Sequence, residues 1–190
     1  MKPDFVVKSP GIPDSSQVIK SYKKNNINVI SEIEFASRHT DSEIVAITGS
    51  NGKTTTTLLT HQILNDEGLN VTIGGNIGTS FSSLLISNDY NYLVLEVSSF
   101  QLDGIVEFKP HIAVITNLSP DHLDRYKNYE DYIKSKFRIV MNQNSNDYFK
   151  YHHTPNDTFD KIIPADMRYL TSAYATMFYL ASEIPINYRK

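Results

Sequence analysis

The residues most able to do chemistry lie in one glycine-rich stretch, Thr48-Gly-Ser-Asn-Gly-Lys-Thr54. A bound triphosphate needs backbone N–H groups aimed inward, a cation near its outer phosphates and a hydroxyl for Mg²⁺. Gly49 and Gly52 permit a tight turn, Lys53 supplies the cation, and Thr54 is the expected Mg²⁺ ligand. We therefore predict a site for ATP and Mg²⁺, whose phosphate-binding residues are Gly49, Ser50, Asn51, Gly52, Lys53, Thr54 and Thr55.

The spacing of this loop is shorter than that of the strict P-loop, which requires a glycine five residues before Gly52. Ile47 occupies that position, so the pattern is a shortened variant, Gly-x-x-Gly-Lys-Thr. An alternative is a helix start that merely contains Gly-Lys. The apolar run before the loop and the helical pattern after it favour the phosphate-binding interpretation.

Further polar groups follow the next strand-like runs. Glu96 ends the run Tyr-Leu-Val-Leu-Glu, where an ATPase places a second Mg²⁺ contact, although an ordinary strand-end glutamate is an open alternative. Asp121, His122 and Asp124 gather in one loop after another apolar run. An isolated histidine is more often structural, and the residues alone leave both readings of His122 open.

The elements that must position these residues alternate between strands and helices. This alternation predicts an α/β fold with an incomplete doubly wound parallel sheet, whose functional loops follow the strand C-termini. We expect a helix from about Lys53 to Glu67, with Leu58, Leu59, Ile63 and Leu64 on its apolar face and Gly68 at its C′ position. The other expected elements are strands at 44–48, 71–73, 92–97 and 112–116 and a helix at 129–141.

The chain is predicted to have three parts. Residues 1–38 contain a strand, a helix beginning near Asp14 or Ser15, and a second strand, which is too little to bury a core alone and resembles the remnant of an N-terminal domain. Residues 39–149 form a partial central ATP-binding domain. Residues 150–190 form a foreign-looking tail that ends in an amphipathic helix.

Composition excludes several classes of protein. A net charge of −3 argues against general nucleic-acid binding, and the absence of cysteine excludes a disulfide framework and thiolate metal sites. The N-terminus has no long apolar run, so we expect neither a signal peptide nor a membrane span, and a cytoplasmic location. The oligomeric state is not predicted.

Five motifs, in order, resemble those of the Mur ligases of peptidoglycan synthesis: ITGSNGKTTTT, GGNIG, LEVSSFQLD, NLSPDHLDRY and KSKFRI. With the N-terminal SPGIP, the resemblance covers about residues 1–149. It implies an ATP-dependent amide-forming ligase that activates a substrate carboxylate as an acyl phosphate. The implied substrates are UDP-N-acetylmuramoyl-L-alanine, D-glutamate and ATP. A related ligase acting on folate fits SSFQLD and SPDHLDRY less well.

The resemblance also implies roles for single residues. Lys53, His122 and Lys136 would be catalytic, and the Mg²⁺ ligands would be Thr54, Glu96, His122 and a Lys136 carbamylated by CO₂. Asn76, Ser98 and Gln101 would line the muramoyl substrate side. The sequence alone predicts Lys136 to be a solvated helix lysine, and only the resemblance reverses that expectation.

The chain departs from the family at both ends. The family's first domain begins well before residue 1 and its central domain continues past residue 149, so we expect an impaired ligase. The alternative is a non-catalytic ATP-binding fragment of a chimeric gene joined near residue 150. Tyr151-His-His-Thr-Pro-Asn-Asp-Thr-Phe-Asp160 resembles the end of di-zinc aminopeptidases, in which His153 would bind zinc. The other ligands of such a site are missing, so zinc is not expected and an aminopeptidase is the last alternative.

Overall fold

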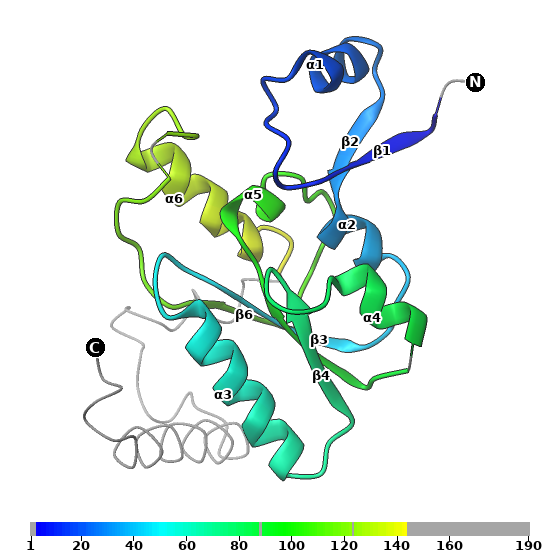
Figure 1. Cartoon of the computed structure of the whole chain (residues 1–190), viewed down its shortest axis with the longest axis vertical. Coiled ribbons are helices and arrows are strands. Elements are labelled where there is room, and N and C mark those ends of the chain that lie inside the picture. Colours follow the sequence, from blue (N-terminus) through cyan, green and yellow to red (C-terminus); the bar gives the residue numbers. More distant parts are fainter. Residues whose placement is uncertain (1–2, 88, 123, 144–190) are drawn as a thin grey trace. The chain divides into compact units, whose positions relative to one another are not determined.

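A computed structural model of the chain describes residues 3–143 except 88 and 123 (Figure 1). The chain divides into two compact units, 1–143 and 144–190, and only the first is described. The predicted tail at 150–190, its C-terminal helix and His153 lie outside the described residues. Among the helices of the described part, none has the length and apolar character needed to cross a membrane.

The first segment is the predicted strand–helix–strand unit. β1 (Phe5–Lys8) and β2 (Asn28–Ser31) pair in parallel, and α1 (Gln17–Lys24) connects them. The helix begins later than predicted because Ser16 is its N-cap and accepts a hydrogen bond from the Ile19 backbone N–H. Asp14, which was expected near that position, forms ion pairs with Lys8 and Lys23 instead.

A short helix that the sequence did not reveal, α2 (Glu32–Ser37), joins the first segment to the central sheet. Its N-cap is Ser31, the last residue of β2, whose hydroxyl accepts from the Glu34 backbone N–H. Six residues make fewer than two turns, so the apolar periodicity is too short to recognise. The strand therefore passes directly into the helix.

The central sheet has four parallel strands in the order β4-β5-β3-β6. The strands are β3 (Glu43–Thr48), β4 (Val71–Gly75), β5 (Tyr92–Glu96) and β6 (Ile112–Ile115). The connecting helices are α3 (Lys53–Asp66), α4 (Phe81–Ser87) and α5 (Ser99–Leu102). The predicted α/β class and parallel sheet are confirmed.

The register of the strands brings the predicted site loops to one edge of the sheet. On β3, Ile47 lies opposite Glu96 of β5, and Thr48 lies opposite Ile115 of β6. Gly75 of β4 is also opposite Glu96. Because the strands are parallel, the loops that follow all four strands begin beside one another.

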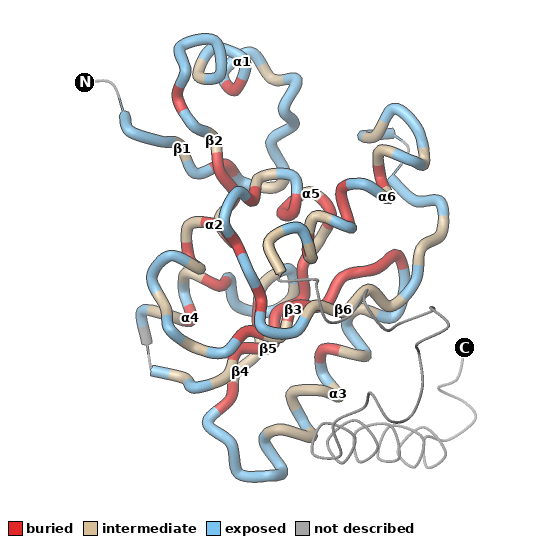
Figure 2. Tube along the Cα trace, turned by 180° about the vertical axis from the view of Figure 1, so that it is seen from behind, coloured by how far each residue is buried: buried red, intermediate tan, exposed pale blue. Residues whose placement is uncertain are grey.

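The two faces of the sheet are covered unequally (Figure 2). One face contributes Ile44, Leu93 and Leu95 to a large core shared with α2, α4 and α5. The other face contributes a smaller cluster, formed by Ile47, Val71 and Val94 with Leu64 of α3 packed against it.

The predicted apolar face of α3 is only partly correct. Leu58 is 52% exposed, while Leu59, Ile63 and Leu64 are half-buried. The one residue of α3 that is fully buried is Thr57. The helix therefore rests on the sheet along a narrow strip, and Leu58 lies beyond it. Gly68, with φ of +77°, follows the C-cap as predicted.

The last described helix, α6 (Tyr129–Phe137), continues into the 3₁₀ turn η1 (Arg138–Val140). Together they match the helix predicted at 129–141. Asn128 is the N-cap and accepts from the Asp131 backbone N–H at 2.8 Å. The buried residues of α6 are Tyr132, Ser135 and Lys136, so this face of the helix points into the protein.

Candidate nucleotide and metal site

The loop between β3 and α3 has the backbone expected of a phosphate cradle. Gly49 has φ of +148° and Gly52 has φ of +78°, conformations that favour glycine. A Cβ on Gly49 would lie 2.0 Å from Oγ1 of Thr116, so a side chain cannot fit there. Gly52 is the N-cap of α3 but provides no side-chain cap, and the first turn contains no acidic residue. The free N–H groups of the helix start therefore favour an anion.

Lys53 is folded onto this loop. Its Nζ donates to the backbone carbonyl oxygens of Gly49 at 2.9 Å and Ser50 at 3.0 Å. The ammonium group thus lies at the loop itself, where phosphate oxygens would gather. Thr55, on the first turn of α3, is exposed.

The segment after β6 forms hydrogen bonds with the phosphate loop through Asn117 and Ser119. The sequence did not single out these two residues. The Asn51 backbone N–H donates to Oδ1 of Asn117 at 3.0 Å, and Nδ2 of Asn117 donates to the Asn51 carbonyl at 2.8 Å. The Ser50 hydroxyl donates to the carbonyl of Ser119 at 2.9 Å. The sequence could have pointed to Asn117 and Ser119 only through their position after β6, the strand that pairs with β3.

Glu96 is 2% exposed and uses both carboxylate oxygens. Oε2 accepts from the Thr54 hydroxyl at 2.7 Å, and Oε1 accepts from Nδ2 of Asn76 at 2.8 Å. The end of β5 is thereby joined to the start of α3 and to the end of β4. Thr54, Glu96 and Asn76, which the sequence singled out separately, form one chain of contacts.

Lys136 is not the solvated lysine that the bare sequence predicts, because it is only 2% exposed. Its Nζ lies 3.4 Å from Oγ1 of Thr48 and 4.9 Å from the ring centroid of Tyr132. Burial, and then the nearby charge of Lys53, lower the pKa of Lys136 to about 8, while Asp121 and Glu96 oppose the shift.

His122 has φ of +52° in a loop and a side chain that is 46% exposed. Its Nε2 lies 3.5 Å from Oδ2 of Asp121, and its ring centroid is 4.9 Å from that of Phe100. Asp124, the third polar residue of this loop, is exposed.

Tyr132 is a residue of the site that sequence reasoning missed. It is completely buried, and its hydroxyl lies 2.9 Å from the Ser50 hydroxyl in the phosphate loop. Its ring contacts the His122 ring edge-on at 6.2 Å and lies below the ammonium of Lys136. The sequence did contain a signal for Tyr132: it lies four residues before Lys136, and residues four apart share one face of a helix.

Ser98 and Gln101 form a capping box at the start of α5. Oε1 of Gln101 accepts from the Ser98 backbone N–H at 2.9 Å, and the Gln101 N–H donates to the Ser98 hydroxyl at 3.3 Å. The described hydrogen bonds of their side chains join these two residues to each other. The structure therefore gives them a capping role, and their predicted contact with a substrate stays a prediction.

The described residues contain no group of three or more His, Cys, Asp or Glu side chains arranged to hold a metal ion. Mg²⁺ is commonly bound by one or two carboxylates together with substrate phosphates and water. Thr54 and Glu96, in contact beside the phosphate loop, fit that kind of shared site. A nucleotide would supply the remaining oxygens.

A glycine loop after a buried parallel strand, a lysine folded onto it and an adjacent threonine–glutamate pair are features typical of nucleoside triphosphate-binding α/β modules. The Mur ligase middle domain family matches residues 47–174, more than half of the chain. The chain belongs to this family, which confirms the resemblance of the motifs. The match extends past residue 149, where the central domain was predicted to stop.

The relatives agree with this assignment. The chain is 54% identical over 149 residues to the UDP-N-acetylmuramoylalanine–D-glutamate ligase of Christiangramia forsetii, covering 78% of this chain and 34% of the relative. It is 48% identical over 171 residues to the ligase of the same name from Cytophaga hutchinsonii, and this match covers 87% of this chain and 38% of the relative. The chain thus spans about a third of the length of the curated relatives it matches.

Among the solved structures that also align is that of UDP-N-acetylmuramate:L-alanyl-gamma-D-glutamyl-meso-diaminopimelate ligase from Neisseria meningitides. The alignment covers 74% of this chain and 49% of that chain, with 19% identity and a TM-score of 0.49. The family assignment does not depend on it.

Proposed function

We propose that this chain provides the ATP-handling part of a cytoplasmic ligase that joins D-glutamate to UDP-N-acetylmuramoyl-L-alanine. The observation that carries the proposal is the contact of Thr54 with Glu96 beside the phosphate loop, with Lys136 buried at the same edge of the sheet. The substrate identities come from the names of relatives about half identical to this chain.

In this proposal the chain's residues position and neutralise the reacting phosphate. The N–H groups at the start of α3 and the Lys53 ammonium bind the outer phosphates of ATP, and transfer of the terminal phosphoryl group to the substrate carboxylate gives an acyl phosphate. Mg²⁺, held by Thr54 and Glu96, would supply charge neutralisation. His122 would serve a second Mg²⁺. The amine of D-glutamate then displaces phosphate.

Lys136 is proposed to carry a carbamate. An amine must be neutral to react with CO₂, and a pKa of about 8 leaves much more neutral amine at pH 7 to 8 than an exposed lysine would have. The product is an anion at a site next to the Thr48 hydroxyl. A ¹³C-NMR carbamate signal in ¹³CO₂-saturated buffer that is absent in Lys136→Met supports this role, and its absence from the parent contradicts it.

A cleft of about 280 Å³ between the first segment and the residues of α5 and of the loop before α6 is the proposed entrance for the muramoyl substrate. Its lining combines two cationic side chains, Lys8 and Arg125, with two carboxylates, Asp14 and Asp103, and the ring of Phe100. Lys8 forms an ion pair with Asp14. Arg125 lies 4.0 Å above that ring and donates to the Pro10 carbonyl at 3.2 Å. In this proposal the Arg125 guanidinium, a side chain well suited to phosphate, would bind the diphosphate of the substrate.

A larger hollow of about 630 Å³ is not the candidate site. It is lined by Glu43, Asn91 and Tyr92, which stand at the N-terminal ends of β3 and β5. Ligands of open parallel sheets bind at the opposite edge, beyond the strand C-termini.

The test of the ligase proposal is phosphate release by the full chain. We expect release only when ATP, Mg²⁺, D-glutamate and UDP-N-acetylmuramoyl-L-alanine are all present, and loss of release in Lys53→Ala. Binding of ATP·Mg²⁺ without any release would instead establish the alternative, a nucleotide-binding fragment without catalysis.

A further inference from the structure

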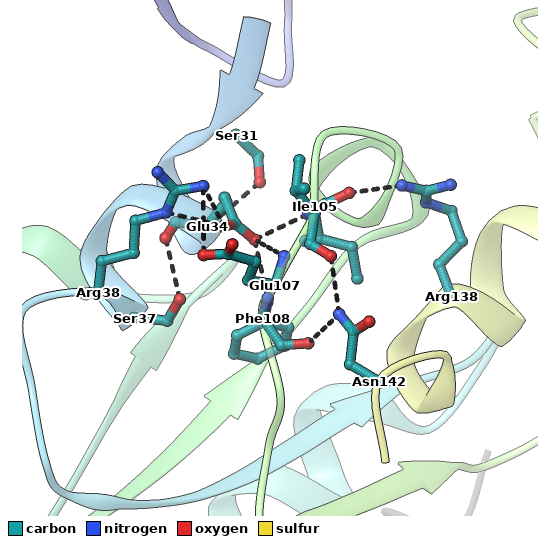
Figure 3. A network of polar contacts seen from close by, with 10 residues as sticks. Ser31, Glu34, Ser37, Arg38, Ile105, Glu107, Phe108, Arg138 and Asn142 are labelled. Carbon is teal, nitrogen blue, oxygen red and sulfur yellow. Dashed lines mark hydrogen bonds and ion pairs between the residues drawn. The ribbon is translucent and has the colours of Figure 1, made fainter. Parts of the chain in front are cut away.

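A carboxylate away from the phosphate loop is buried against the loop between α5 and β6, residues 103–111 (Figure 3). Glu34, on α2, has no exposed surface. Its Oε2 accepts from three successive backbone N–H groups, those of Val106 at 2.8 Å, Glu107 at 3.0 Å and Phe108 at 2.8 Å. Successive N–H groups that converge on one point form an anion-binding concavity. Glu34 fills this concavity from within the chain.

The second oxygen of Glu34 is also fully used. Oε1 accepts from Nε of Arg38 at 2.9 Å and from Nη2 at 2.7 Å (Figure 3). A buried charge is tolerated when it is paired and hydrogen-bonded, and here every partner is a donor. An amide at this position would turn its own N–H groups toward other donors. The site therefore requires an anion and not merely a side chain of this shape.

The carbonyl side of the same loop is held by the segment that continues from α6. Arg138 and Asn142 donate to backbone carbonyl oxygens in and next to the loop, and Figure 3 shows the contacts with Ile105 and Phe108. The acceptors are Leu102 at 2.7 Å and Ile105 at 2.6 Å for Arg138, and Val106 at 2.9 Å and Phe108 at 3.0 Å for Asn142. Helix α6, which carries Tyr132 and Lys136, is thus anchored to this loop.

The first segment meets the loop directly. The backbone N–H of Ser31, the last residue of β2, donates to the Gly104 carbonyl at 2.8 Å. A Cβ on Gly104 would lie 2.7 Å from the Ser31 nitrogen, so the two backbones are too close for any larger residue. The loop is therefore the common support of the first segment and of α6.

We propose that Glu34 is a positioning residue, which holds the first segment and α6 in one fixed arrangement by filling the anion concavity of the 103–111 loop. The two walls of the cleft described above belong to these parts: Lys8 ends β1, and Tyr126 lies just before α6. Glu34 shapes that cleft without touching a ligand in it. This inference does not depend on the proposed ligase function, because it concerns the ligand-free chain.

The test is amide hydrogen exchange of the full ligand-free chain. In Glu34→Ala we expect the amides of 104–108, and those of 8–15 and 129–142, to exchange at least about tenfold faster than in the parent, while α3 keeps its protection. Glu107→Gln is the matched control on the same loop. The Glu107 side chain is 76% exposed and lies 3.8 Å from Arg38, so this variant weakens only that exposed pair and leaves the contacts of Glu34 in place. It should exchange as the parent does.

Chemical rescue separates an anion site from a simple loss of packing. Formate should restore protection in Glu34→Ala, whereas formamide, its neutral counterpart, should not. Unchanged exchange in Glu34→Ala, a uniform increase that includes α3, or equal rescue by both compounds overturns the proposal. If Glu34→Ala does not fold, Glu34→Gln is measured instead. The same regional increase supports the proposal, and exchange like that of the parent overturns it.

Discussion

At the scale of single residues, the buried lysine is the feature that most changes the interpretation of the sequence. Lys136 is spaced like a surface lysine of an amphipathic helix, yet it is enclosed beside Thr48 and Tyr132. Its neighbour in the sequence on the same helix, Lys134, is 73% exposed. Burial of an ammonium group without a close carboxylate disfavours the charged form and costs stability.

Lys136→Met is therefore expected to stabilise the nucleotide-free chain by about 1–3 kcal/mol at pH 7 in CO₂-free buffer. Urea unfolding measures the difference. Lys134→Met is the control, and it should change stability by less than about 0.5 kcal/mol because only exposed pairs with Glu130 and Asp131 are lost. A clear loss of stability in Lys136→Met would show that the ammonium is well solvated or paired.

Glu34 gives a pH dependence of known sign. Burial raises the pKa of this carboxyl, but hydrogen bonds from the 106–108 backbone and from Arg38 outweigh it and hold the pKa below its ordinary value of 4.5. A depressed pKa stabilises the fold above the unfolded-state pKa, and this contribution is lost as the pH falls through the folded-state pKa. The stability difference between the parent and Glu34→Gln should shrink as the pH falls below about 4.5, as urea unfolding at several pH values will measure. A constant difference contradicts this.

At the scale of elements, sheet order decides which residues meet. The apolar runs predicted the strands, and the motif order predicted that Thr54 and Glu96 belong to one site. The cross-contacts of Asn117 and Ser119 with the phosphate loop depend on β6 lying beside β3, which no local pattern encodes. The role of Glu34 was equally hidden, because its partners are about seventy residues away in the chain.

The glycine at the start of the phosphate loop is required by packing as well as by conformation. Gly49→Ala places a methyl group against the Thr116 side chain and backbone, so we expect a loss of at least about 3 kcal/mol in thermal or urea unfolding. Gly68→Ala is the control, because Gly68 also has a positive φ but has open space around it. Its expected loss in the free energy of unfolding is about 1 kcal/mol. Equal losses would mean that conformation alone matters at Gly49.

At the scale of the whole molecule, the two faces of the central sheet in the described unit bury very different amounts of apolar side chain. The sheet face against α2, α4 and α5 has an extensive core, whereas α3 leaves Leu58 exposed and the edge strand β6 leaves Ile112 56% exposed. The chain spans about a third of the length of the curated relatives it matches. We expect nucleotide binding at the loop between β3 and α3 to stabilise this unit, because a ligand that binds only the folded state shifts the folding equilibrium toward it.

The most direct measurement is the thermal melting of the full chain with and without ATP·Mg²⁺, in the parent and in Lys53→Ala. A ligand at about a hundred times its dissociation constant should stabilise the parent by about 2.7 kcal/mol, seen as a rise in Tm. Lys53→Ala should fold and melt cooperatively but show little rise, because the cation at the phosphate loop is gone. An equal rise in both proteins, or none in the parent, would contradict the assignment of this loop as the nucleotide site.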